Sequence, residues 1–285
     1  MVRANVLLAL TSTEELAAFN EYDQLHNPLL LSHGQAALLL YSLIDNDAAM
    51  TYPLFHRLLE LSDAVFDERT AGDMLPEIIR QGVKILEKKS LTGGDRERLA
   101  QVEQVAVNIA KQQGKPYSGG GAREHYVRPR LEPYCDLGLL SKPDKSRFVY
   151  QVTPALRSLL QNWSDLNSTD TFLNEHFFAS LSALHGLPLR EASDDEARLS
   201  LQRAGEQLKS TLGYSPIIDV ALLAGIDLLF EQGRVFEVAS TTRLLKEWQK
   251  QAPDLVRFSV DRMGALAYLK FLKPLPIAAE RAHGG

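Results

Sequence analysis

Apolar side chains recur every three or four residues along most of this chain, which is the spacing of amphipathic helices. Residues 33–60 carry two such patterns, and Asp45-Asn46-Asp47 together with Pro53 supplies a break between them. The same spacing predicts further helices over residues 73–89, 95–112, 171–185, 194–212, 215–231 and 235–250. The chain is therefore expected to be mainly α-helical.

Polar residues at the ends of the 73–89 helix fit its expected direction. Asp73 stands at the start, where a carboxylate can accept hydrogen bonds from free backbone N–H groups. Lys88 and Lys89 lie in the last turn, where positive charge complements the helix dipole. These signals predict that the helix begins at Asp73.

Two parts of the chain have the composition of β-strands. Residues 148–152 are β-branched or aromatic with one exception, which is typical of a strand. Residues 255–272 form two further apolar runs around a turn at 261–264. Short β-hairpins among the helices are expected.

The residues that follow the glycines at 119–121 predict a short helix that carries several arginines. Val127, Leu131 and Tyr134 fall at helical spacing and would face the protein interior. Pro129 suits a first helical position, whereas Pro133 cannot donate the expected backbone hydrogen bond. We therefore expect the helix to be short or kinked.

The residues after this helix give the most informative order of elements in the chain. Gly138 can end the helix in a left-handed conformation, and Pro143-Asp144 signals a turn between basic residues. The strand at 148–152 follows, and Thr153-Pro154 then begins another helix. This run resembles the second half of a winged-helix domain, in which one helix can enter a DNA groove and a β-hairpin wing contacts the backbone.

The resemblance implies a fold of winged-helix-like domains joined by helical segments. Residues 1–90 are expected to form an acidic helical domain, and residues 91–163 a winged-helix-like domain. Residues 171–275 are expected to form a helical domain that ends in a β-hairpin, with a second winged-helix-like unit as an alternative.

Charge is distributed unevenly along the chain, although the net charge of −5 alone disfavours nucleic-acid binding. Residues 1–79 carry 3 Lys and Arg against 12 Asp and Glu, a net of −9. Residues 80–147 carry 14 against 8, a net of +6, and residues 148–285 carry 14 against 16, a net of −2. The positive charge is therefore concentrated where the winged-helix resemblance lies, which suggests an anionic partner.

This distribution predicts a double-stranded DNA partner. The helix would offer arginines to the groove, and the wing would offer cations to phosphates. The candidate nucleic-acid-binding residues are Arg123, His125, Arg128, Arg130, Lys142, Lys145 and Arg147.

A second interpretation assigns the basic surface to contacts between proteins. The acidic amino-terminal segment could dock on it within the chain, and many winged-helix domains bind proteins and not DNA. The chain would then be a non-catalytic scaffold or adaptor subunit, with a protein partner or a second copy of itself.

No residue pattern predicts catalysis, a metal site or a cofactor. The seven histidines are scattered and include no His-Glu-x-x-His helix. The glycines at 119–121 lack the Gly-Lys-Ser/Thr order of a phosphate-binding loop, so we expect a flexible connection there. The single cysteine, Cys135, lies in an apolar part of a helix and is expected to be an inert thiol.

A cytoplasmic location without a membrane segment is expected. The apolar run at 6–10 is too short for a signal-peptide core or a membrane span, and Glu14 and Glu15 follow it closely. The single cysteine also fits a reducing compartment.

Overall fold

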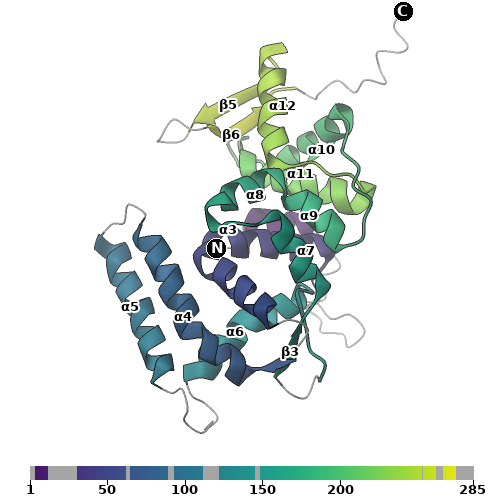
Figure 1. The fold of residues 1–285 in the computed structure, drawn as a ribbon. Helices are drawn as coiled ribbons and strands as arrows, with labels where there is room; N and C mark the ends of the chain where they lie inside the picture. Colours follow the sequence, from purple (N-terminus) through teal and green to yellow (C-terminus); the bar gives the residue numbers. More distant parts are fainter. Residues whose placement is uncertain are drawn as a thin grey trace, which may run out of the picture. The chain divides into compact units, whose positions relative to one another are not determined.

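The structure is a computed structural model, and it describes residues 4–11, 31–61, 65–88, 93–111, 122–144, 148–251, 253–260 and 266–273. These residues are mainly helical and include two small antiparallel sheets of three strands each (Figure 1). The predicted fold class, mainly α with short β-hairpins, is confirmed at this level.

The chain divides into two compact units. They are named by their place in the sequence: the outer unit comprises the two ends of the chain, Met1–Ser42 and Asp170–Gly285, and the central unit comprises the middle, Leu43–Thr169. This grouping differs from the sequence ranges, which placed a boundary at residue 90. The reason is long-range pairing, because strand β1 (Phe66–Asp67) pairs with strand β3 (Val149–Val152) and so joins residues on both sides of that boundary.

The central unit combines helices with a sheet of strand order β1-β3-β2. Helix α3 (His33–Glu60) enters it from the outer unit and leaves helical geometry at Asp47, which confirms the break predicted at 45–47. The other elements are α4 (Glu68–Glu87), α5 (Gly93–Ala110), α6 (Ala122–Asp136), β2 (Leu140–Ser141), α7 (Pro154–Asn162) and η1 (Leu166–Ser168).

Aromatic side chains fill the core of the central unit. Phe55 lies with its ring centroid 4.8 Å from that of Tyr134 and 6.4 Å from that of Trp163, both in edge-to-face geometry. Tyr150 is fully buried and stacks on Phe66 of the neighbouring strand at 5.8 Å. These large side chains join α3, α6 and the sheet by burying apolar area.

Two helix starts differ from the prediction, and one helix end agrees with it. Helix α4 begins at Glu68 and not at Asp73, because the Asp67 side chain accepts a hydrogen bond from the Thr70 N–H at 2.8 Å. Helix α6 begins at Ala122, so Pro129 lies inside it and not at its first position. Gly138 (φ 69°) ends α6 as predicted, with the Leu139 N–H donating to the Tyr134 carbonyl.

The outer unit is built around the apolar helix α11 (Ile217–Gln232), whose residues are buried along most of its length. Gly225 of this helix touches Phe178, since a Cβ atom added there would lie 2.4 Å from the ring. The other elements are α1 (Ala4–Leu10), the start of α3, α8 (Thr169–Glu175), α9 (Phe177–Leu184), α10 (Asp194–Gln207), β4 (Ser215–Pro216), α12 (Val238–Gln251), β5 (Val256–Val260) and β6 (Leu266–Phe271).

The two units share one arrangement of helix and sheet. In the outer unit the strand order is β4-β6-β5, so the first strand pairs with the last, as in the central unit. Helix α12 leads into β5 and β6, and helix α6 leads into β2 and β3. The hairpin predicted at 255–272 is therefore confirmed as two paired strands, while its turn at 261–264 lies outside the described residues.

A half-buried carboxylate joins the start of α12 to helix α9. Glu237 accepts hydrogen bonds from the backbone N–H groups of Phe178 (3.1 Å) and Ala179 (2.8 Å). Burial raises the pKa of Glu237 to about 7, although these donors favour the ionised form and oppose the rise. Burial also raises the pKa of Asp227 in α11 to about 6.

We predict that these two carboxyls make stability fall as pH rises. A folded-state pKa above the unfolded value gives stability that is present below the unfolded pKa and lost as pH passes the folded pKa. For Glu237 the window runs from 4.5 to about 7. The free energy of unfolding, measured by urea denaturation, should therefore fall between pH 5 and pH 8, with Glu237 contributing on the order of 2 kcal/mol.

Glu237→Gln should flatten this dependence and leave the weaker contribution of Asp227. The Gln amide oxygen can still accept one of the two backbone hydrogen bonds, while its NH2 group faces the other N–H, so circular dichroism should first show that the variant keeps its native helix content. Glu175→Gln, at an exposed position of α8, is the matched control and should keep the wild-type slope. Equal slopes in wild type and Glu237→Gln would contradict the assignment to Glu237.

Candidate nucleic-acid interface

The structure describes three of the seven predicted nucleic-acid-binding side chains. These are Arg128 and Arg130 on α6 and Lys142 after β2. Arg123 and His125 belong to α6, but their side chains lie outside the described part of the structure, as do residues 145–147 with Lys145 and Arg147. The role of all seven in nucleic-acid binding stays a prediction.

Arg128 is held by a carboxylate and an aromatic ring of the central unit. Its Nε donates to Glu68 Oε1, and its Nη2 donates to Glu68 Oε2 at 3.2 Å, so the pair is bidentate. Its guanidinium carbon also lies 3.5 Å from the centroid of the Phe148 ring. Since Glu68 is buried and Phe148 precedes β3, Arg128 ties α6 to the start of α4 and to the sheet.

Arg130 and Lys142 have carboxylate partners too. Arg130 Nη1 donates to Asp47 Oδ2 at 3.2 Å, at the point where α3 leaves helical geometry. Lys142 Nζ donates to Glu132 Oε2. The other oxygen, Oε1, accepts a hydrogen bond from the Tyr150 hydroxyl, with 2.8 Å between the two oxygens. Burial raises the pKa of Tyr150, and the bond to the Glu132 carboxylate raises it further. These contacts fix α6 against its surroundings.

The ion pairs limit what this surface can offer to a polyanion. A phosphate could use Arg128, Arg130 or Lys142 only by competing with the carboxylate each cation already contacts. For Arg128 that exchange would leave the buried Glu68 carboxylate without this partner, which is costly. The described cations of α6 and its hairpin therefore stabilise the unit.

A different helix presents exposed positive charge. On α12, Arg243, Lys246 and Lys250 are exposed and lie three and four residues apart, so they share one helix face. The opposite face of this helix carries the buried residues Thr241, Leu244, Leu245 and Trp248. Arg243 contacts Glu247 at 3.5 Å, whereas Lys246 and Lys250 make no ion pair with another described residue.

The hairpin that follows α12 contacts this helix and carries two cations in its strands (Figure 1). Arg257 of β5 is paired in register with Lys270 of β6, so their side chains emerge on the same face of the sheet. Arg257 is exposed, while Lys270 Nζ donates to the Leu212 carbonyl at 3.2 Å. The α12 stripe, defined as Arg243, Lys246 and Lys250, could have been found from its helical spacing in the sequence.

Cys135 fits the prediction of an inert thiol. Burial raises its pKa to about 11, and the neighbouring Glu132 carboxylate adds to the rise. The protonated thiol is a poor nucleophile. Among the described residues, no three His, Cys, Asp or Glu side chains gather so that they could hold a metal ion.

No protein-family model, curated protein or solved structure matches this chain. Within the ranges that the structure describes, none of the helices combines the length and the apolar character needed to cross a membrane.

We predict that Arg128→Ala destabilises the central unit by about 1–3 kcal/mol, because the buried Glu68 carboxylate loses its bidentate partner. Urea denaturation measures the effect. Arg69→Ala, an exposed arginine one residue beyond Glu68, should stay within about 0.5 kcal/mol of wild type. A similar loss in both variants would argue against a structural role for the Arg128–Glu68 pair.

Proposed function

We propose that this chain is a cytoplasmic, non-catalytic DNA-binding accessory or regulatory protein, and that it contacts double-stranded DNA through the outer unit. The observation that carries the proposal is the α12 stripe, an exposed basic helix face followed directly by a β-hairpin. The winged-helix resemblance, which lies in the stretch that contains α6, β2 and β3, joins two parts of the same kind, a helix for the groove and a hairpin for the backbone.

The dimensions and charge of α12 suit this task. A helix of 14 residues is about 21 Å long, and the major groove of B-DNA is wide enough to admit one helix. Cations on its outer face would neutralise phosphates and release counterions, which is the main source of sequence-independent affinity. Arg257 of the hairpin would extend the contact along the backbone.

The local charge of the stripe stands out against an acidic background. The outer unit carries 14 Lys and Arg against 19 Asp and Glu, a net of −5. An overall acidic unit repels DNA at most orientations, so a single cationic face would select one orientation of approach. Binding should therefore depend strongly on salt.

The central unit supports a second function, an adaptor that binds a protein partner. The specific observation is the pairing of Arg128, Arg130 and Lys142 with carboxylates of the same unit, which lowers the positive charge offered by α6 and its hairpin. Lack of DNA binding at low salt, together with co-purification of one partner in fixed stoichiometry, would favour this function over the first.

We predict that Lys246→Ala combined with Lys250→Ala weakens binding to a short DNA duplex about tenfold at about 50 mM salt. Two fewer phosphate contacts should also lower the slope of log affinity against log salt by about 2. Fluorescence anisotropy of labelled duplex at several salt concentrations measures both quantities.

Arg190→Ala combined with Arg203→Ala is the matched control, because it removes two exposed cations of the same unit that are not part of α12. This control should keep the wild-type salt slope. The assignment to α12 fails if both double variants lose affinity equally, since net charge alone would then explain the loss. Arg128→Ala combined with Arg130→Ala tests the sequence-based assignment to α6 in the same assay.

A further inference from the structure

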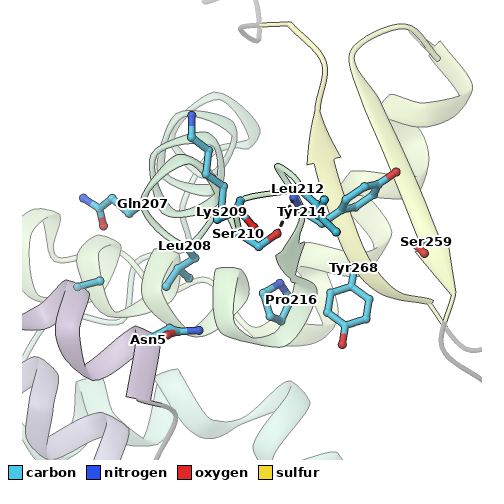
Figure 2. Close-up of a pocket in the computed structure, with 12 residues that line it drawn as sticks. Asn5, Gln207, Leu208, Lys209, Ser210, Leu212, Tyr214, Pro216, Ser259 and Tyr268 are labelled. Carbon is cyan, nitrogen blue, oxygen red and sulfur yellow. Dashed lines mark hydrogen bonds between the residues drawn. The ribbon is translucent and has the colours of Figure 1, made fainter.

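The outer unit contains a cavity of about 1010 Å³ that the proposed DNA contact does not use. Three segments surround it, as Figure 2 shows: helix α1, the turn after α10, and one face of the β4-β6-β5 sheet. The residues that line it are Asn5, Ala9, Gln207, Leu208, Lys209, Ser210, Thr211, Leu212, Tyr214, Pro216, Ser259 and Tyr268.

The register of the sheet explains which face borders the cavity. Tyr268 of β6 is paired with Pro216 of β4 on one side and with Ser259 of β5 on the other, so the three side chains share one face. The adjacent residue Leu269 points to the opposite face and is fully buried in the core. The cavity is therefore held by the ordered sheet and lies on its outer side.

Apolar groups on the cavity wall are left in contact with water. Leu212 is 76% exposed and Tyr268 is 44% exposed, while Leu208 and Pro216 line the wall between them and α1 (Figure 2). Removing this apolar area from water would contribute about 25 cal/mol of binding free energy for each Å² that a ligand covers. A ligand with an apolar body would recover this free energy.

The charges at the cavity favour a neutral ligand. Lys209 is the single charged residue among the lining residues, and its ammonium is paired with the Glu206 carboxylate. In Figure 2 the Lys209 side chain extends away from Pro216 and Tyr268. The lining residues include no carboxylate, so a cation would find no opposite charge there. The Lys270 ammonium beside the wall already donates to the Leu212 carbonyl at 3.2 Å and lies over the Tyr214 ring.

Uncharged polar groups at the wall could orient such a ligand. Asn5 and Gln207 bring side-chain amides, and Ser259 and Tyr268 bring hydroxyls. Cavities of several hundred to about 1,000 Å³ that are mainly apolar with a few polar groups are typical of small-molecule sites.

We propose that this cavity binds a neutral organic molecule with a flat apolar body and one or two hydrogen-bonding groups. The body lies against Leu208, Leu212 and the Tyr268 ring, and the polar groups meet the Asn5 amide and the Ser259 hydroxyl. The α12 stripe does not line this site, although Arg257 of the proposed DNA contact lies on the same face of the sheet, so ligand binding is measured without DNA.

The test uses the full chain and N-phenyl-1-naphthylamine, a neutral flat dye with one N–H group whose fluorescence rises in apolar surroundings. Wild-type protein should bind one dye molecule saturably. Leu212→Ala should weaken dye binding about fivefold, because it removes an exposed apolar wall without disturbing the core. Ser259→Trp should abolish binding by filling the cavity with an indole ring.

Leu189→Ala is the matched control, since Leu189 is a 70% exposed leucine of the same unit that does not line the cavity. It should bind the dye like wild type, and circular dichroism should show native helix content in all variants. Absence of saturable binding to wild type would overturn the proposal. It would also be overturned if Leu212→Ala and Ser259→Trp bound the dye normally, or if sedimentation showed a dimer that both variants dissociate, because a second copy would then cover this face.

Discussion

Each unit depends on a short strand that pairs across the chain with the last strand of its sheet. Phe66 and Asp67 of β1 pair with Tyr150 and Val149, and β4 pairs with β6 in the outer unit. These pairings fix where the helices between them can pack, because the first and last strands then share one sheet. In the central unit Glu68 follows β1 directly. Its ion pair with Arg128 joins α4 to α6, in addition to the backbone hydrogen bonds between the strands.

Local features of the sequence predicted the elements more reliably than their boundaries. The break near Asp47, the glycine at 138 and the strand at 148–152 all follow from residues within a few positions of each other. The start of α4 was missed because two acidic residues, Asp67 and Asp73, can both cap a helix. Choosing between them requires knowing that residues 66 and 67 form a strand, which depends on a distant partner.

The contrast between local features and distant contacts also separates the cations of α6 from those of α12. Counting charges along the chain located a basic segment, but it could not reveal that Glu68 and Asp47 lie against Arg128 and Arg130. Such pairs join residues far apart in sequence, so no periodicity predicts them. The α12 stripe does not stand out in a charge count, because acidic residues in the surrounding third of the chain offset its cations.

The close approach of α11 to α9 has a consequence for how this protein can vary. At Gly225 a single hydrogen fills the space beside the Phe178 ring, and even a methyl group would overlap it. Alanine at 225 would therefore need a smaller side chain at 178, and neither replacement alone would restore the interior to close packing. The two positions should change together in divergent versions of this protein, so a covarying small–large pair would identify the same interior in chains whose surfaces have little else in common.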